Sequence, residues 1–133
     1  MSTTQIGTRE ILTLARENFE FAREIRRHLH RHPELSFHEF ETADYVEKKL
    51  HELGLFHIKR INQTGVVALL KNNRENCVAL RADLDALPIT ETDDREYRSL
   101  NEGVMHACGH DAHTAALLGA AKILCSIRDK IKG

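Results

Sequence analysis

Apolar residues recur at three- and four-residue steps along two segments in the first half of the chain. The first stripe covers residues 11–29 and the second covers residues 40–53. This spacing predicts two amphipathic helices, each burying one face against a core. We expect the first helix to end near His32, because Pro33 disfavours helical geometry in the residue before it.

The two ends of the second helix are marked by local signals. Ser36 is expected to be its N-cap, with Glu39 three residues later as the reciprocal partner. Leu35 and Phe40 flank this start as a hydrophobic pair. Gly54 falls where a left-handed residue commonly ends a helix. The pattern therefore predicts a helix that begins just after Ser36 and ends just before Gly54.

The pattern changes after this helix. Residues 55–61 mix apolar and polar positions, which predicts a weak strand near a sheet edge. Residues 66–70 and 77–82 are continuous apolar runs separated by the polar turn 71–76. We expect these two runs to be adjacent strands, the second buried on both faces.

The second half of the chain predicts a long loop followed by a helix. No period survives between Asp83 and Asp111, and residues 90–103 are polar and charged. Apolar positions return over residues 114–131 with helical spacing. The resulting order, ααβββα, predicts an α/β layered fold.

Composition limits the class of protein and its partners. The chain has 133 residues, enough for one domain, and a formal net charge of −1, which argues against nucleic acid or a membrane surface as partner. It shows no signal-peptide pattern and no run of about 20 apolar residues, so we expect a cytoplasmic protein. The three cysteines are expected to be free, buried or metal-bound. Cys77 and Cys125 fall in apolar runs and are interpreted as core packing.

Two segments carry weak signals for chemistry. His28 and His32 lie four residues apart and could bind a metal from one helix face, although a solvated, positively charged helix end explains them as well. Asp83 and Asp85 follow the second apolar run, at a strand end where α/β sheets build sites. Such a pair could ligate a metal or orient a base, or could simply cap the turn.

The strongest chemical signal lies in residues 105–114. His106, His110 and His113 occur there together with Cys108 and Asp111. Thiolate and imidazole are good ligands for Zn²⁺, Ni²⁺ or Co²⁺, and a nearby carboxylate can orient a ligating histidine. A polar loop with a helix N-cap would explain Asp111 but not the whole cluster. The segment therefore predicts a metal site.

Three segments together resemble the M20 metallopeptidase family. They are RRHLHRHPELSFHEFET, RADLDALPI and MHACGHDAHTAALLGAAKIL. In this order they are similar to the first third of the amidohydrolase branch, which includes hippurate hydrolases, N-acetyldiaminopimelate deacetylases and indole-acetyl-amino-acid hydrolases. The resemblance implies the N-terminal part of a zinc-peptidase-like α/β/α layered catalytic domain, with an incomplete sheet.

The resemblance also implies a chemistry and its residues. Such amidohydrolases cleave the amide bond of N-acyl amino acids with two divalent metal ions (Zn, Mn, Ni or Co) per active site and a glutamate base. Cys108 and His110 match the family's thiolate and imidazole metal ligands. Asp83 and Asp85 match its acidic pair, one member of which is expected to orient a ligand. His113 matches a position near the metals.

The resemblance further predicts what residues 1–133 do not supply. The family's glutamate base, its later metal ligands and its lid and dimerisation domain all lie beyond the matching third. Two ligands are too few for a catalytic metal pair, since catalytic zinc usually has three. We expect a single partial catalytic domain that is inactive alone and could self-associate through an exposed sheet edge.

Two alternative functions stay open at this point. A non-catalytic metal-binding or interaction module could reuse these motifs without hydrolysis, and would fold cooperatively by itself. A redox-active thiol protein would depend on Cys108 alone, which has no C-x-x-C partner.

Overall fold

The structure is a computed structural model that describes residues 6–72 and 76–131. Its elements, in chain order, are α1 (Thr8–Glu17), α2 (Phe19–Arg31), α3 (Phe40–Glu52), β1 (His57–Ile61), β2 (Gly65–Leu69), α4 (His110–Ser126) and a short 3-10 helix, η1 (Arg128–Lys130). No helix in this described part of the chain is both long and apolar enough to cross a membrane.

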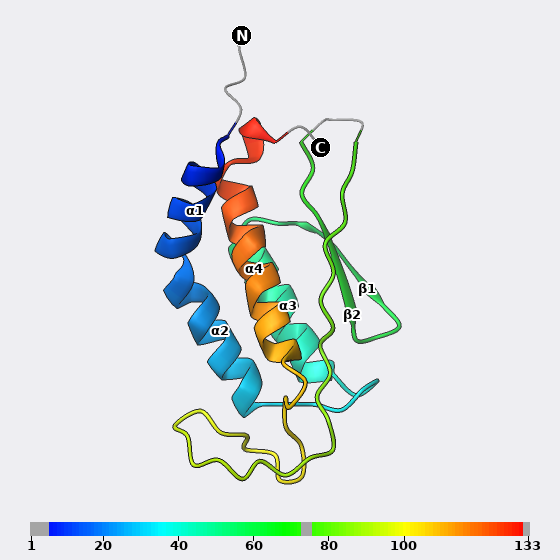
Figure 1. The fold of residues 1–133 in the computed structure, drawn as a ribbon. Coiled ribbons are helices and arrows are strands. Elements are labelled where there is room, and N and C mark those ends of the chain that lie inside the picture. Colours follow the sequence, from blue (N-terminus) through cyan, green and yellow to red (C-terminus); the bar gives the residue numbers. More distant parts are fainter. Residues whose placement is uncertain (1–5, 73–75, 132–133) are drawn as a thin grey trace.

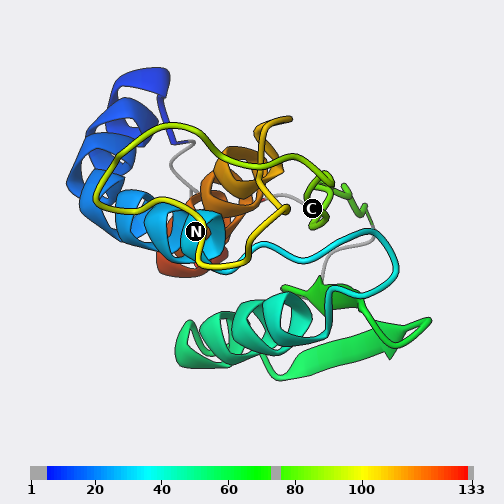
Figure 2. The ribbon, with the colours of Figure 1, turned by 90° about the horizontal axis from the view of Figure 1, so that it is seen from below.

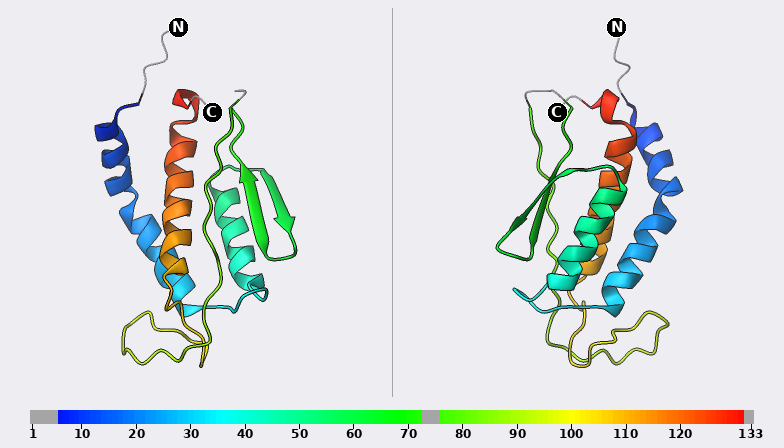
Figure 3. Two further views of the ribbon diagram at one scale, coloured as in Figure 1. Left: turned by 45° about the vertical axis from the view of Figure 1, so that its right-hand side comes forward. Right: turned by 180° about the vertical axis from the view of Figure 1, so that it is seen from behind.

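The helices pack side by side around α4. Figures 1 and 3 show α2 and α3 on either side of α4, with the hairpin β1–β2 beyond α3. The core lies where α2, α3 and α4 meet; its buried residues are Ile25, Leu29, Val46, Leu50, Leu55, Ala115 and Leu118. The apolar stripes predicted from the sequence are thus the faces that form this core.

The first predicted helix is divided in two at Asn18. The side-chain Nδ2 of Asn18 donates to the carbonyl of Leu14 at 2.8 Å, and its backbone N–H donates to the same carbonyl at 3.1 Å. Asparagine side chains compete in this way for backbone groups that would otherwise continue a regular helix. The predicted end near His32 is confirmed, because α2 ends at Arg31.

The predicted capping box at the start of α3 is wrong, whereas the predicted C-cap is confirmed. The N-cap residue is Glu39, and its side chain makes no capping hydrogen bond. Instead the carboxylate of Glu34 accepts hydrogen bonds from the N–H groups of Glu41 (3.2 Å) and Thr42 (2.7 Å). The Glu34 carboxylate thus satisfies two free N–H groups of the first turn, and its negative charge lies at the positive end of the helix dipole. Gly54 has φ +81°, the left-handed geometry expected after a helix.

The sheet of the described residues has two strands rather than three. β1 and β2 pair antiparallel, with His57 opposite Leu69 and Ile61 opposite Gly65. The half-buried Ile58, Val66 and Ala68 pack against the core. The described helices and strands follow the order αααββα. The predicted order ααβββα is therefore wrong in its third strand and in its undivided first helix.

The expected strand at residues 77–82 is an extended segment with exposed side chains. Val78 is 79% exposed and Leu80 is 57% exposed. This segment runs along the length of the molecule (Figure 1), and no described strand forms a ladder with it. An apolar strand is buried on both faces only when neighbouring strands and helices cover it, and the described residues supply no such cover.

The last helix begins four positions earlier than predicted, at His110 instead of Thr114. Gly109 precedes it in a left-handed conformation (φ +91°), and its carbonyl accepts hydrogen bonds from the N–H groups of Ala112 and His113. The sequence pattern missed this start because the first turn of α4 is polar. The helix also ends earlier, at Ser126, and is followed by η1. As a result His110 and Asp111 lie in the first turn of a helix rather than in a loop.

Candidate metal centre

The candidate centre lies where the end of the extended segment meets the start of α4. Leu87 and Met105 form an antiparallel bridge, with each backbone N–H donating to the other's carbonyl at 3.0 Å. This bridge holds the residues just before Leu87 beside those just after Met105. Figure 2, seen from below, shows these loops gathered over the ends of α2 and α4.

Asp85 and His110 make the central contact of the centre. The Nδ1 atom of His110 lies 2.9 Å from Oδ1 of Asp85 and 3.0 Å from the Asp85 carbonyl oxygen. Both oxygens are acceptors, so Nδ1 carries a hydrogen and Nε2 is the ring nitrogen that would bind a metal. A carboxylate in this position fixes the tautomer and orientation of a metal-binding imidazole. This geometry is the one that an orienting role for Asp85 requires, and the role itself stays a prediction.

The thiol of Cys108 lies beside the contact between Asp85 and His110. It is exposed, and its Sγ atom is 3.9 Å from the carbonyl oxygen of Asp85. Cys108 and His110 therefore both contact Asp85 while keeping donor atoms available. A soft thiolate and an imidazole of this kind suit zinc and related transition metals.

The other predicted aspartate is turned to a different partner. The carboxylate of Asp83 pairs with Arg81 at 2.7 Å, and its side chain is 48% exposed. Its backbone carbonyl accepts a hydrogen bond from Thr114 Oγ1 at 2.9 Å. Among the described residues, no contact joins the Asp83 carboxylate to Cys108 or His110. Asp83 thus ties the extended segment to α4 through its backbone.

The donors present do not complete a metal site by themselves. Within residues 6–72 and 76–131, no group of three or more His, Cys, Asp or Glu side chains could hold a metal ion. The exposed His113 ring lies 5.9 Å from the His110 ring, measured between centroids. Cys108 and His110 fit a metal ion in donor type, and His110 is held in place by Asp85. Together they supply two donors.

His106 does not belong to the exposed part of the cluster. It is 4% exposed, and neither ring nitrogen has a hydrogen-bond partner among the described residues. Burial lowers the pKa of His106 from 6.5, against the opposing effect of the Asp111 carboxylate. The sequence pattern grouped His106 with His110 and His113, but the structure buries His106 and leaves the other two rings accessible.

His28 and His32 contact other rings. The His28 ring stacks on Tyr45 with centroids 3.9 Å apart, and lies 4.8 Å from the ring of His32. Burial, and then the positive charges of His32, Lys49 and Arg31, lower the pKa of His28. This surrounding positive charge favours the non-metal interpretation of the pair.

The two other cysteines differ from each other. Cys125 packs against the core, as predicted, and burial raises the pKa of its thiol. Cys77 is exposed, so its interpretation as a core residue is wrong. The reason is that the described residues place no sheet around residues 77–82.

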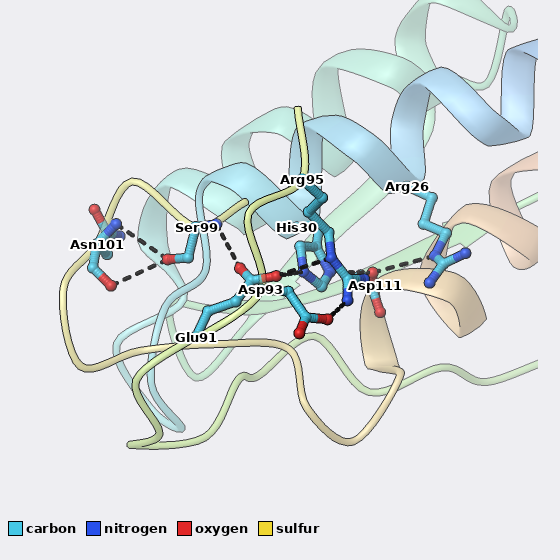
Figure 4. Close-up of polar contacts among 8 residues, drawn as sticks. All are labelled: Arg26, His30, Glu91, Asp93, Arg95, Ser99, Asn101 and Asp111. Carbon is cyan, nitrogen blue, oxygen red and sulfur yellow. Dashed lines mark hydrogen bonds and ion pairs between the residues drawn. The ribbon is translucent and has the colours of Figure 1, made fainter. Parts of the chain in front are cut away.

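A buried polar network beside the centre was not found by sequence reasoning. Figure 4 shows the ring of His30 between two carboxylates: Nδ1 is 2.8 Å from Asp111 Oδ2, and Nε2 is 3.1 Å from Glu91 Oε1. His30, Glu91 and Asp111 are 2%, 5% and 1% exposed. Arg26 reaches the same Asp111 oxygen at 3.3 Å, and Arg95 reaches Glu91 at 3.3 Å.

The sequence held little signal for this network. His30 lies next to Leu29 on the buried stripe of the first helix, but Glu91 lies in a polar segment with no period. Burial opposes the charged form of Glu91, yet the hydrogen bond from the Ser99 N–H and the contacts with His30 and Arg95 outweigh it. The pKa of Glu91 is therefore lowered from 4.5.

The comparison of this chain with known proteins identifies its family. A model of peptidase family M20/M25/M40 matches residues 79–133, which include the candidate centre. An N-acyl-L-amino acid amidohydrolase from Geobacillus stearothermophilus is 53% identical over 109 residues, covering 81% of this chain and 30% of that protein. This chain belongs to peptidase family M20.

Solved structures resemble the M20 chain along almost its whole length. A proposed aminohydrolase from methicillin-resistant Staphylococcus aureus superposes with a TM-score of 0.89 at 39% identity, covering 96% of this chain and 34% of that one. The YxeP protein of Bacillus subtilis, a dinuclear metal-binding peptidase of the M20 family, superposes with a TM-score of 0.80 at 40% identity, covering 91% and 33%. The M20 chain thus spans about a third of the length of these proteins.

Proposed function

We propose that this M20 chain supplies part of the active site of a metal-dependent amidohydrolase that cleaves the amide bond of N-acyl amino acids. The observation that carries the proposal is the contact of Asp85 with His110, beside the Cys108 thiol. The reaction and the substrate class are those named for the Geobacillus stearothermophilus relative. The metal requirement is supported by the similarity to the Bacillus subtilis protein, which is a dinuclear metal-binding peptidase.

The chain's own residues would prepare two ligands. Asp85 accepts the Nδ1 hydrogen of His110, which holds the ring in one orientation and leaves Nε2 as the nitrogen that would bind the metal. Cys108 directly precedes Gly109, the N-cap residue of α4, so its exposed thiol lies beside His110. A divalent metal bound there would polarise the scissile carbonyl and activate water as the nucleophile.

We propose that further ligands and the general base come from sequence outside residues 1–133. A catalytic zinc usually has three protein ligands, and the described residues offer two donors at the centre. The chain alone should therefore bind metal but release no amino acid from an N-acyl substrate. A non-catalytic metal-binding module derived from the family is the second candidate, because two donors at the centre do not by themselves make a catalytic metal site.

The proposal is tested by titrating the purified chain with Zn²⁺, Ni²⁺ and Mn²⁺ in a calorimeter. We expect binding that weakens strongly in Cys108→Ser and in His110→Gln, because each removes a ligand atom. Cys77→Ser is the matched control, since that thiol is also exposed but lies outside the centre. Binding that is absent, or equal in all three variants, would contradict the ligand assignment.

A hydrolysis assay separates the two candidate functions. The chain is mixed with a metal and an N-acyl amino acid. The assay is run with and without a longer M20 protein that is inactive because the cysteine corresponding to Cys108 is replaced by serine. Amino acid released only in the mixture supports a partial active site. Metal binding without release in either case supports the non-catalytic module.

A further inference from the structure

The first turn of α4 is held from two sides by carboxylates. On one side Asp85 accepts a hydrogen bond from His110. On the other side Asp111, the next residue in the helix, points into the protein and is 1% exposed. Its Oδ2 atom lies 2.8 Å from His30 Nδ1 and 3.3 Å from Arg26 Nε. The turn that carries His110 is therefore fixed to α2 through the side chain of Asp111.

His30 also contacts a third segment of the chain, the loop that carries Glu91. Its other nitrogen, Nε2, lies 3.1 Å from Glu91 Oε1 (Figure 4). Each nitrogen of the His30 ring thus has a buried carboxylate as its partner. Hydrogen bonds to charged, buried groups are short and strong, and they are costly to break on one side only. Glu91, His30 and Asp111 thus form one continuous buried chain.

The loop that carries Glu91 is itself fastened to the end of α2. The N–H of Ser99 donates to Glu91 Oε2 at 2.7 Å. The N–H of Leu100 donates to the carbonyl of Arg31 at 2.9 Å, and Asn101 Nδ2 donates to the carbonyl of Pro33 at 2.7 Å. These bonds give Glu91 a fixed position, so that it can restrain His30.

We propose that His30 and Glu91 are positioning residues for the metal centre. Through Asp111 they set the orientation of the first turn of α4, and with it the direction of the His110 imidazole relative to Cys108. Neither residue is a ligand. The inference rests on the proposed function, because it concerns the affinity of the Cys108 and His110 pair for a metal.

A purely structural role predicts a different result. If the network only holds the loop and α2 against α4, its loss lowers stability and leaves the folded fraction with normal ligand geometry. If it positions the ligands, its loss changes metal affinity and ligand geometry in protein that is still folded. The two roles therefore separate when metal binding is compared between variants of equal stability.

The test is a titration of the metal-free chain with Co²⁺, read by visible absorption and paired with thermal unfolding of the metal-free protein. The variants are His30→Gln and Glu91→Gln. His57→Gln is the matched histidine control, because His57 is exposed on β1. Val46→Ala is the stability control, because it opens the core on α3 without touching the network. The Cys108 thiolate is read from its charge-transfer band with Co²⁺.

We expect His30→Gln and Glu91→Gln to weaken Co²⁺ binding by about tenfold or more, the usual effect of removing an outer partner of a metal ligand. Their thiolate band should also shift or weaken at saturating Co²⁺. Val46→Ala and His57→Gln should bind as the unaltered chain does, although Val46→Ala unfolds at a lower temperature. If His30→Gln does not fold, Glu91→Gln decides the question by the same two readouts.

Each other result has a defined meaning. If the unaltered chain binds Co²⁺ with a thiolate band and both network variants match it, the positioning role is overturned and the proposed function stands. If affinity falls in Val46→Ala as much as in the network variants, the role is structural and the inference is also overturned. If the unaltered chain gives no thiolate band at any Co²⁺ concentration, the metal centre itself is refuted, and the inference with it.

Discussion

At the scale of single residues, the decisive property is which partner each polar group finds. Asp83 and Asp85 are two positions apart and look equivalent in sequence, yet one carboxylate pairs with Arg81 and the other with His110. The difference lies in the nearest available group: Arg81 on the same segment for Asp83, and His110 at the start of α4 for Asp85. The bridges at Ala86 and Leu87 hold the backbone directly after Asp85, next to the segment that leads into α4.

Asp85→Asn tests this division of roles. An asparagine keeps an oxygen acceptor for His110 but removes the negative charge, so we expect the affinity for Zn²⁺ to fall by about tenfold or more. Stability should change little, because Asp85 is partly exposed. Calorimetric titration gives the affinity. Asp83→Asn is the control and should bind as the unaltered chain does; equal losses in both variants would show that the aspartates act through net charge alone.

At the scale of elements, the start of α4 sets the positions of the two proposed ligands, Cys108 and His110. Gly109 has φ +91°, and a Cβ atom added there would meet no atom within 4 Å. The requirement for glycine is therefore one of backbone conformation, since only glycine enters the left-handed region without strain. Gly109 is the residue between Cys108 and His110, both of which contact Asp85.

Gly109→Ala should destabilise the fold by about 1 kcal/mol, the usual cost of a left-handed residue with a Cβ. Urea unfolding measures the change. Gly7→Ala is the matched control: Gly7 also precedes a helix and has free space around it, but its φ is −91°. Equal stability of the Gly109→Ala and Gly7→Ala variants would argue against conformational strain at residue 109.

The same scale includes the loop fastened by Glu91. Because the pKa of Glu91 is lower in the folded chain than 4.5, the folded state favours its charged form. This contribution to stability is complete above about pH 4.5 and is lost as the pH falls through the lower, folded value. Acidification should therefore release the loop.

Glu91→Gln tests this pH dependence. The variant should be less stable than the unaltered chain at pH 7, and the difference should shrink as the pH falls below 4.5. Urea unfolding at a series of pH values gives both curves. Glu96→Gln is the control, because that carboxylate is exposed and its distance to Arg27 is 3.9 Å. Parallel curves for Glu91→Gln and the unaltered chain would show that Glu91 does not contribute through its charge.

At the scale of the whole molecule, apolar surface is left uncovered along the extended segment and the hairpin. Val78 and Leu80 are exposed, and so are Val67 and Leu69 on β2. Apolar surface and free strand edges of this kind are typical of interfaces or of self-association. The expected self-association through an exposed edge stays a prediction, now located at residues 76–82.

A double substitution, Val78→Lys with Leu80→Glu, should suppress this association. The charges disfavour strand pairing and keep the net charge unchanged. Sedimentation velocity over a range of concentrations should show larger species for the unaltered chain and fewer for the variant. Leu12→Lys is the control, because Leu12 is 53% exposed on α1, away from the segment. A monomer at every concentration would contradict the prediction.

The sequence by itself determined the local features of this protein. Pro33 and Gly54 placed the ends of two helices, because both residues restrict or permit backbone angles whatever surrounds them. The residue types in 105–114 and the family motifs indicated Cys108 and His110 as ligands. These signals depend on neighbours within a few positions, so they are readable along the chain.

Only the tertiary structure decided which polar residues are buried together. The contacts of His30 join residues 81 and 61 positions apart, and no local pattern encodes such pairs. The same holds for residues 77–82, whose apolar run predicts a buried strand while their exposure depends on which elements lie beside them. Burial is a property of the assembled surface, because removing a group from water requires atoms from distant parts of the chain.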